Sequence, residues 1–101
     1  MSKIKVIIKE PFKVPYVSKI DNTLEALQKI VEGYIETVTV DQDMVIICDE
    51  EGLLKGNHFN CRVLNIQFFG TIIFAGVNGD EFSDLPISEE EFKKLFPRLY
   101  S

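Results

Sequence analysis

The stretch "DNTLEALQKIVEGYIETVTVDQDMVIIC", residues 21–48, determines the fold class that we expect for this chain. In its first part, residues 21–33, apolar side chains recur at the spacing of one helix face, which predicts an amphipathic helix. Asn22 is expected to cap the start of this helix, with Glu25 three residues later as in a capping box. Gly33 is expected to end the helix in a left-handed conformation, which glycine adopts without steric cost.

Two predicted strands complete the stretch. Residues 34–40 are rich in β-branched side chains, and residues 44–48 are apolar on both faces, as in an interior strand. The turn-forming sequence "DQD" at 41–43 would join the two strands as a hairpin. A helix followed by short hairpin links favours a sheet with helices packed on it.

Further strands are predicted on both sides of this stretch. Residues 3–10 alternate between apolar and mostly lysine positions, which predicts a half-buried strand. Residues 13–20 form a second strand that pairs with the first as a hairpin, and Pro15 favours an edge or bulge position for it, since proline lacks an amide donor. Residues 66–77 carry one or two strands, with Gly70 as a candidate bulge.

The chain closes with a short predicted helix at 86–96. Ser88 is its expected N-cap, Glu91 completes a capping box, and Pro97 stops the helix.

Taken together, the elements predict an α+β fold in a single domain, 1–101: an antiparallel or mixed sheet of about five to six strands with one central and one C-terminal helix. The strand–helix–strand passage through 13–40 would add one parallel pair if it is a crossover. The pattern of residues 53–65 fits either a strand or a loop, and both alternatives are kept.

Composition restricts the function classes. The net charge of −5 disfavours general binding to nucleic-acid backbones, which are themselves anionic. Two cysteines are too few for a disulfide scaffold, and no apolar run approaches the length of a membrane span. The N-terminus lacks the pattern of a secretory signal. We therefore expect a cytoplasmic protein with reduced thiols and no membrane partner.

The segment "CDEEGLLKGNHFNCR", residues 48–62, concentrates the residues that could carry chemistry. Cys48 and Cys61 are interpreted as structural, because an apolar strand raises the pKa of a thiol and makes it a poor nucleophile. The acids near Cys48 lack the ligand spacing of a calcium loop and are interpreted as turn residues. No catalytic residue, metal or cofactor is predicted.

A ligand contact is the remaining hypothesis for this segment, because loops displayed on a scaffold often carry binding groups. The candidate ligand-binding residues are Asn57, His58, Asn60 and Arg62.

Charge is unevenly distributed along the chain. Residues 1–20 contain five lysines and one glutamate, whereas residues 80–91 contain six acids and no base. We interpret these segments as solvated faces of opposite sign; the alternative is that the basic hairpin attracts a phosphorylated small molecule or that the acidic face docks on a basic partner.

The segments "DNTLEALQKIVEGYIETVTV", "DEEGLLKGNHFN" and "FFGTIIFAG" resemble an uncharacterised family of short proteins from bacteriophages, plasmids and other bacterial mobile elements. The matching positions are Leu24, Gln28, Gly33, Tyr34, Ile35, Glu36, Glu50, Glu51, Gly52, Gly56, Asn60, Gly70 and the helix from Ser88. The chain departs at Asp49, where the family often has asparagine, and at "NHFN", where a version with proline is common. The resemblance implies an accessory protein of a mobile element and brings no catalytic residues.

The resulting hypothesis is a non-enzymatic protein that binds a small, nucleotide-like ligand or a host protein, in the service of anti-defence. The alternative is an acidic DNA mimic that inhibits a nucleic-acid enzyme. The tail, with Phe96, Leu99 and Tyr100 expected to be exposed, favours a homodimer; a monomer with the tail folded back is the competing expectation.

Overall fold

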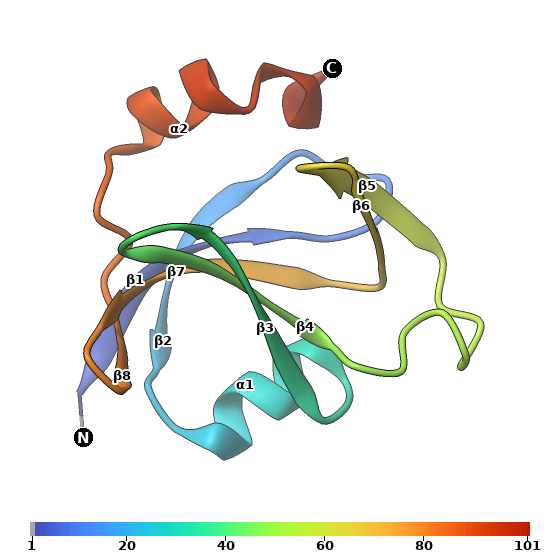
Figure 1. Cartoon of the computed structure of the whole chain (residues 1–101), viewed down its shortest axis with the longest axis horizontal. Helices are drawn as coiled ribbons and strands as arrows, with labels where there is room; N and C mark the ends of the chain where they lie inside the picture. The colour runs from blue at the N-terminus through green and yellow to red at the C-terminus, as the bar shows by residue number, and fades with distance from the viewer. Residues whose placement is uncertain (1) are drawn as a thin grey trace.

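The computed structural model describes residues 2–101 and shows an α+β fold (Figure 1). The elements follow in the order β1 (Lys3–Lys9), β2 (Tyr16–Asp21), α1 (Leu24–Val31), β3 (Ile35–Asp41), β4 (Met44–Asp49), β5 (Phe59–Val63), β6 (Ile66–Phe69), β7 (Ile72–Asn78), β8 (Glu81–Ser83), α2 (Glu89–Leu95) and the 3-10 helix η1 (Pro97–Tyr100).

The main sheet has the strand order β2-β1-β7-β4-β3, with β8 paired to β7, while β5 and β6 form a separate two-stranded sheet. The predicted β1–β2 and β3–β4 hairpins are confirmed, and β2 is an edge strand, as Pro15 indicated. Of the two alternatives, an antiparallel or a mixed sheet, the structure has the first, because every pairing found within residues 2–101 is antiparallel. Helix α1 carries the chain from one edge of the sheet to the other, so β2 and β3 never meet.

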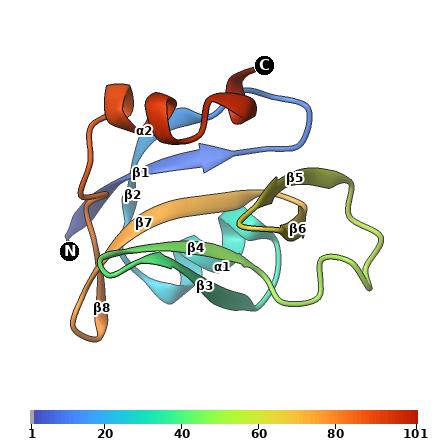
Figure 2. The same cartoon turned by 45° about the horizontal axis from the view of Figure 1, so that its top comes forward.

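Both faces of the main sheet are covered, and the two helices lie on opposite sides of it (Figure 1). On one face, Val6 and Ile47 pack with α1 through Leu27 and Val31. On the other face, α2, η1 and the β5–β6 hairpin cover the core around Phe74. In Figure 2, η1 lies over the β5–β6 hairpin and close to the loop that joins β1 to β2.

Strand β1 is more buried than its alternating sequence predicts. Ile7 is 2% and Lys9 5% exposed, although both lie on the face that was expected to meet solvent. The second layer of β5, β6 and η1 covers that face near the end of β1, so a lysine is enclosed there.

Helix α1 begins and ends differently from the prediction. Thr23 is its N-cap and accepts a hydrogen bond from Ala26 N at 3.1 Å, while the Asn22 amide donates to Phe82 O at 2.9 Å. The left-handed C-cap is Glu32 (φ 61°), and Gly33 is needed for another reason: a Cβ there would lie 2.5 Å from Asp49 Oδ1.

Helix α2 confirms the predicted capping box: Glu91 N donates to Ser88 Oγ at 3.1 Å, and Ser88 N donates to Glu91 Oε1 at 3.2 Å. The tail beyond α2 is not exposed as expected. Leu99 is 8% exposed, and Phe96 and Tyr100 pack against the core, because η1 folds back over the sheet.

Segment 53–65 consists of a loop followed by β5, which pairs with β6 as a hairpin. Residues 66–77 contain two strands, and Gly70 (φ +85°) lies between them, where Gly70 N donates to His58 O at 2.8 Å. The bulge predicted at Gly70 is found instead in β5, where the register shifts between Phe59 and Cys61. No helix within residues 2–101 has the length and hydropathy needed to span a membrane.

Candidate functional site

The loop after β4 is held by a buried carboxylate. The Asp49 side chain is 1% exposed; it accepts hydrogen bonds from Glu51 N at 3.0 Å, from Lys55 Nζ at 2.6 Å and from the Asn57 amide at 3.4 Å. Lys55 Nζ also donates to Glu32 O at 2.7 Å, which ties the loop to the end of α1. Asp49 thus anchors the loop from a buried position, so the interpretation of these acids as solvated turn residues is wrong for Asp49, whereas Glu50 and Glu51 are exposed as expected.

Electrostatics explain why Asp49 is ionised in this position. Burial by itself would raise the pKa of its carboxyl group, but the hydrogen bonds from Lys55 and Glu51 N and the Lys55 charge outweigh burial, so the pKa is lowered. Asn57 contributes in the same direction, so it acts as a structural partner of Asp49.

Asn60 is the second anchor and lies at the bulge of β5. Its amide Nδ2 donates to Lys9 O and to Gly70 O, both at 2.7 Å, and its Oδ1 accepts from Lys9 Nζ at 2.9 Å. Lys9 Nζ also donates to Glu10 O at 2.9 Å. One asparagine therefore joins β5, the end of β1 and the β6–β7 connection around a buried amine.

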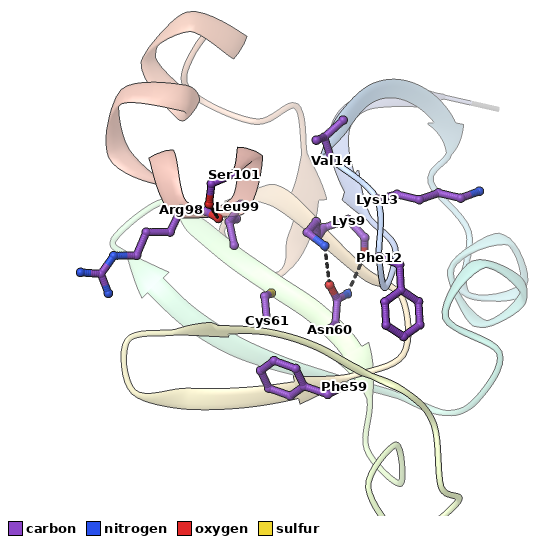
Figure 3. Close-up of a pocket in the computed structure, with 10 residues that line it drawn as sticks. All are labelled: Lys9, Phe12, Lys13, Val14, Phe59, Asn60, Cys61, Arg98, Leu99 and Ser101. Carbon is purple, nitrogen blue, oxygen red and sulfur yellow. Dashed lines mark hydrogen bonds between the residues drawn. The ribbon is translucent and has the colours of Figure 1, made fainter.

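A cavity of about 320 Å³ opens beside this amine, and we call it the Lys9 cavity (Figure 3). Three segments build it: the end of β1 with the following loop, strand β5, and η1. Its lining residues are Lys9, Phe12, Lys13, Val14, Phe59, Asn60, Cys61, Arg98, Leu99 and Ser101.

The charged side chains of the Lys9 cavity are all basic. Lys9 Nζ points toward its centre, whereas the exposed Lys13 and Arg98 side chains extend outward on either side of it (Figure 3). Lys13 forms an ion pair with Glu10 at 3.6 Å, but within residues 2–101 Lys9 has no carboxylate within ion-pair distance. Burial lowers the pKa of the Lys9 amine, and Cys61 acts in the opposite direction.

The Lys9 ammonium group has one N–H donor without an acceptor among the described residues. An ammonium group has three N–H donors, and the Asn60 and Glu10 oxygens accept two. Within residues 2–101, the third donor of Lys9 is thus free toward the cavity, which Lys13 and Arg98 also line.

The four predicted ligand-binding residues do not form one site. Asn60 lines the Lys9 cavity, while Asn57 and His58 line a second cavity of about 430 Å³, and Arg62 borders a third. The exposed His58 does not line the Lys9 cavity, but its ring packs edge-on against Phe12, which does; the two ring centroids are 5.4 Å apart. The one Lys or Arg that lines the second cavity, Lys55, is already paired with Asp49.

Sequence reasoning missed Lys9, Phe12 and Arg98. The excess of lysines in residues 1–20 was the one signal that pointed toward Lys9. The position of Arg98 depends on how the tail folds back, which no local pattern specifies.

Both cysteines are free and buried. Burial raises the pKa of each thiol to about 11, so both are protonated at neutral pH. Within residues 2–101, no three His, Cys, Asp or Glu residues are grouped closely enough to hold a metal ion.

The fold and this cavity define the class of the protein: a small α+β protein with a basic cavity between its sheet, a hairpin and its C-terminal tail. The family model "Domain of unknown function (DUF3846)" matches residues 4–97, and the chain belongs to that family. The resemblance to an uncharacterised family is confirmed at this level. No curated protein and no solved structure matches the chain.

Proposed function

We propose that this chain is a non-enzymatic accessory protein that binds a small anionic ligand in the Lys9 cavity. One observation carries the proposal: Lys9 is 5% exposed, its amine lines a cavity, and among the described residues it bonds neutral oxygens and has no carboxylate within ion-pair distance. A buried ammonium without a counter-charge is unfavourable. An anion in the cavity would supply the missing charge and accept the third hydrogen bond.

Binding is favoured over catalysis by the state of the groups that could react. Both thiols are held protonated by burial, and the imidazole of His58 lies against an aromatic ring. A nucleophile needs a lowered pKa or an adjacent base. Asn60 instead holds Lys9 in place, because it accepts a hydrogen bond from the Lys9 amine and donates one to the Lys9 carbonyl oxygen. A binding group that is fixed in this way is preorganised for its ligand.

The biological setting of the proposal rests on the family resemblance stated from the sequence. We propose a cytoplasmic protein of a phage or another bacterial mobile element that sequesters a small host molecule and so weakens a defence response. Sequestration needs no chemistry, because binding alone lowers the free concentration of a signal molecule.

The test is a titration with inorganic phosphate followed by amide chemical shifts. Saturable shifts are expected at Lys9, Asn60 and the tail around Arg98, and the affinity should fall as salt is added. Lys9→Met is expected to abolish binding, and the control Lys19→Met, which removes an exposed lysine on β2, should leave it unchanged.

Arg98→Gln provides a second variant if Lys9→Met does not fold, because Arg98 is exposed and forms no ion pair among the described residues. It should weaken binding several-fold. Shifts that do not saturate, or that spread equally over all surface lysines, would contradict the proposal and favour a protein partner.

A further inference from the structure

Phe12 combines two features that the fold itself does not require. Its backbone is in the left-handed region (φ 68°), which L side chains adopt at a cost, and its side chain is 82% exposed. Glycine or asparagine would make the same turn with less strain. A large apolar ring at a strained, exposed position indicates a contact that the isolated chain does not make.

The ring of Phe12 is nevertheless held in one place. Its edge contact with His58 has a centroid distance of 5.4 Å and an interplanar angle of 63°. Pro11 precedes it, and proline restricts the backbone of the loop. Phe12 lines the Lys9 cavity, and in Figure 3 its ring lies at the rim of the cavity beside Asn60.

A second ring stands on another wall of the same cavity. Phe59 is 48% exposed and is supported by Phe69, with centroids 5.6 Å apart at 74°. The Lys9 cavity therefore offers a buried cation at its centre, flexible cations beside it and aromatic rings at its edge.

From this arrangement we infer that the ligand is a phosphorylated molecule with a planar ring, a mononucleotide in chemical class, and that Phe12 is the residue that stacks on the ring. This inference rests on the proposed function and specifies its ligand. The phosphate would meet Lys9, with Lys13 and Arg98 turning inward; an arginine can bind a phosphate through two parallel hydrogen bonds. Stacking of a base on an aromatic side chain is a strong and sequence-tolerant contact.

The size of the cavity supports one nucleotide. Small-molecule sites have volumes of about 300–1,000 Å³, and the Lys9 cavity, at about 320 Å³, lies at the lower end. Of the remaining lining residues, Val14 and Leu99 are apolar and would face the sugar and the ring edge, and Ser101 is polar.

The experiment compares calorimetric titrations with the four common nucleoside 5′-monophosphates, inorganic phosphate and adenosine. We expect at least one nucleotide to bind more tightly than phosphate. Phe12→Gly should weaken that nucleotide roughly tenfold or more, with phosphate affinity unchanged within about twofold. The same variant should change the melting temperature little, because relief of the left-handed strain offsets the greater freedom that glycine has in the unfolded chain.

Leu64 is the matched control, since it also has a positive φ (52°) and an exposed side chain, and it is not among the residues that line the Lys9 cavity. Leu64→Gly should likewise change the melting temperature little and should leave all affinities unchanged. If glycine loosens the loop at Phe12, Phe12→Leu removes the ring face while it keeps an apolar side chain, and it should also weaken the nucleotide.

Each outcome decides a different statement. Nucleotides that bind no tighter than phosphate, or that bind both Phe12 variants as tightly as the parent protein, would overturn this inference and leave an anion site in place. If neither phosphate nor any nucleotide binds, the proposed function fails together with the inference.

Discussion

Replacement of Asp49 by asparagine should reveal how much of the fold depends on the loop anchor. The carboxylate is 1% exposed and meets Lys55 Nζ at 2.6 Å, Glu51 N at 3.0 Å and the Asn57 amide at 3.4 Å. Asparagine has the same shape, but it keeps a single oxygen acceptor and places an amide against another donor. The substitution thus removes charge-assisted hydrogen bonds with little change in packing.

The expected loss follows from these contacts. A hydrogen bond to a charged group contributes about 1.5–3 kcal/mol when its partners are buried. Lys55 is 39% exposed, so solvent screening reduces its share, and the 3.4 Å contact with Asn57 is weak. We expect Asp49→Asn to lower the free energy of unfolding by about 2 kcal/mol at neutral pH.

The pH dependence has a definite sign. The pKa of Asp49 is lowered in the folded protein, so its stabilisation is complete above the unfolded value of about 3.9 and is lost as pH falls through the folded pKa. The difference between the parent and Asp49→Asn should therefore be largest at neutral pH and shrink in acid.

Urea unfolding followed by far-ultraviolet circular dichroism measures this difference, since the chain has no tryptophan for fluorescence. Glu50→Gln is the control, because Glu50 is the adjacent acid and is exposed. The reasoning is refuted if the two variants lose the same free energy, or if the Asp49→Asn difference stays constant into acid.

Three further predictions concern stability and thiol reactivity. Leu64 and Asn65 both have positive φ in the β5–β6 turn, so Leu64→Asn should raise the free energy of unfolding by about 1 kcal/mol; a lower urea midpoint would contradict this. The Tyr100 hydroxyl is buried without a hydrogen-bond partner among the described residues, so Tyr100→Phe should stabilise by about 1 kcal/mol in the same assay, and a clear loss would show an unrecognised partner. Burial raises the pKa of the Cys48 and Cys61 thiols to about 11, so a thiol reagent at pH 8 should react slowly with native protein and with two thiols per chain after denaturation; fast native reaction would refute the buried state.

The sequence by itself determined the elements whose causes are local. The capping box of α2 involves Ser88 and Glu91, three residues apart, and it is found as predicted. The β1–β2 and β3–β4 hairpins follow from alternation and turn residues within about twenty positions of chain. The α+β class follows from the order of these elements, since each apolar face needs another layer to cover it.

Tertiary contacts decided the features that depend on residues far apart in the chain. The local sequence favours Asn22 as the N-cap. In the structure, however, its amide donates to the carbonyl oxygen of Phe82, sixty positions away, and Thr23 is the N-cap. Glycine is needed at position 33 because the Asp49 side chain lies where a Cβ would be. The rules for helix ends concern neighbouring residues and do not predict this contact.

The Lys9 cavity is the clearest case of a feature that only the tertiary structure decided. A lysine in an alternating strand is expected to face solvent, yet Lys9 is enclosed because Asn60, fifty-one positions away, supplies an acceptor and η1 closes over it. Enclosure of a charge depends on which distant groups replace its water, and that is set by packing of β1, β5 and the tail, not by any one segment.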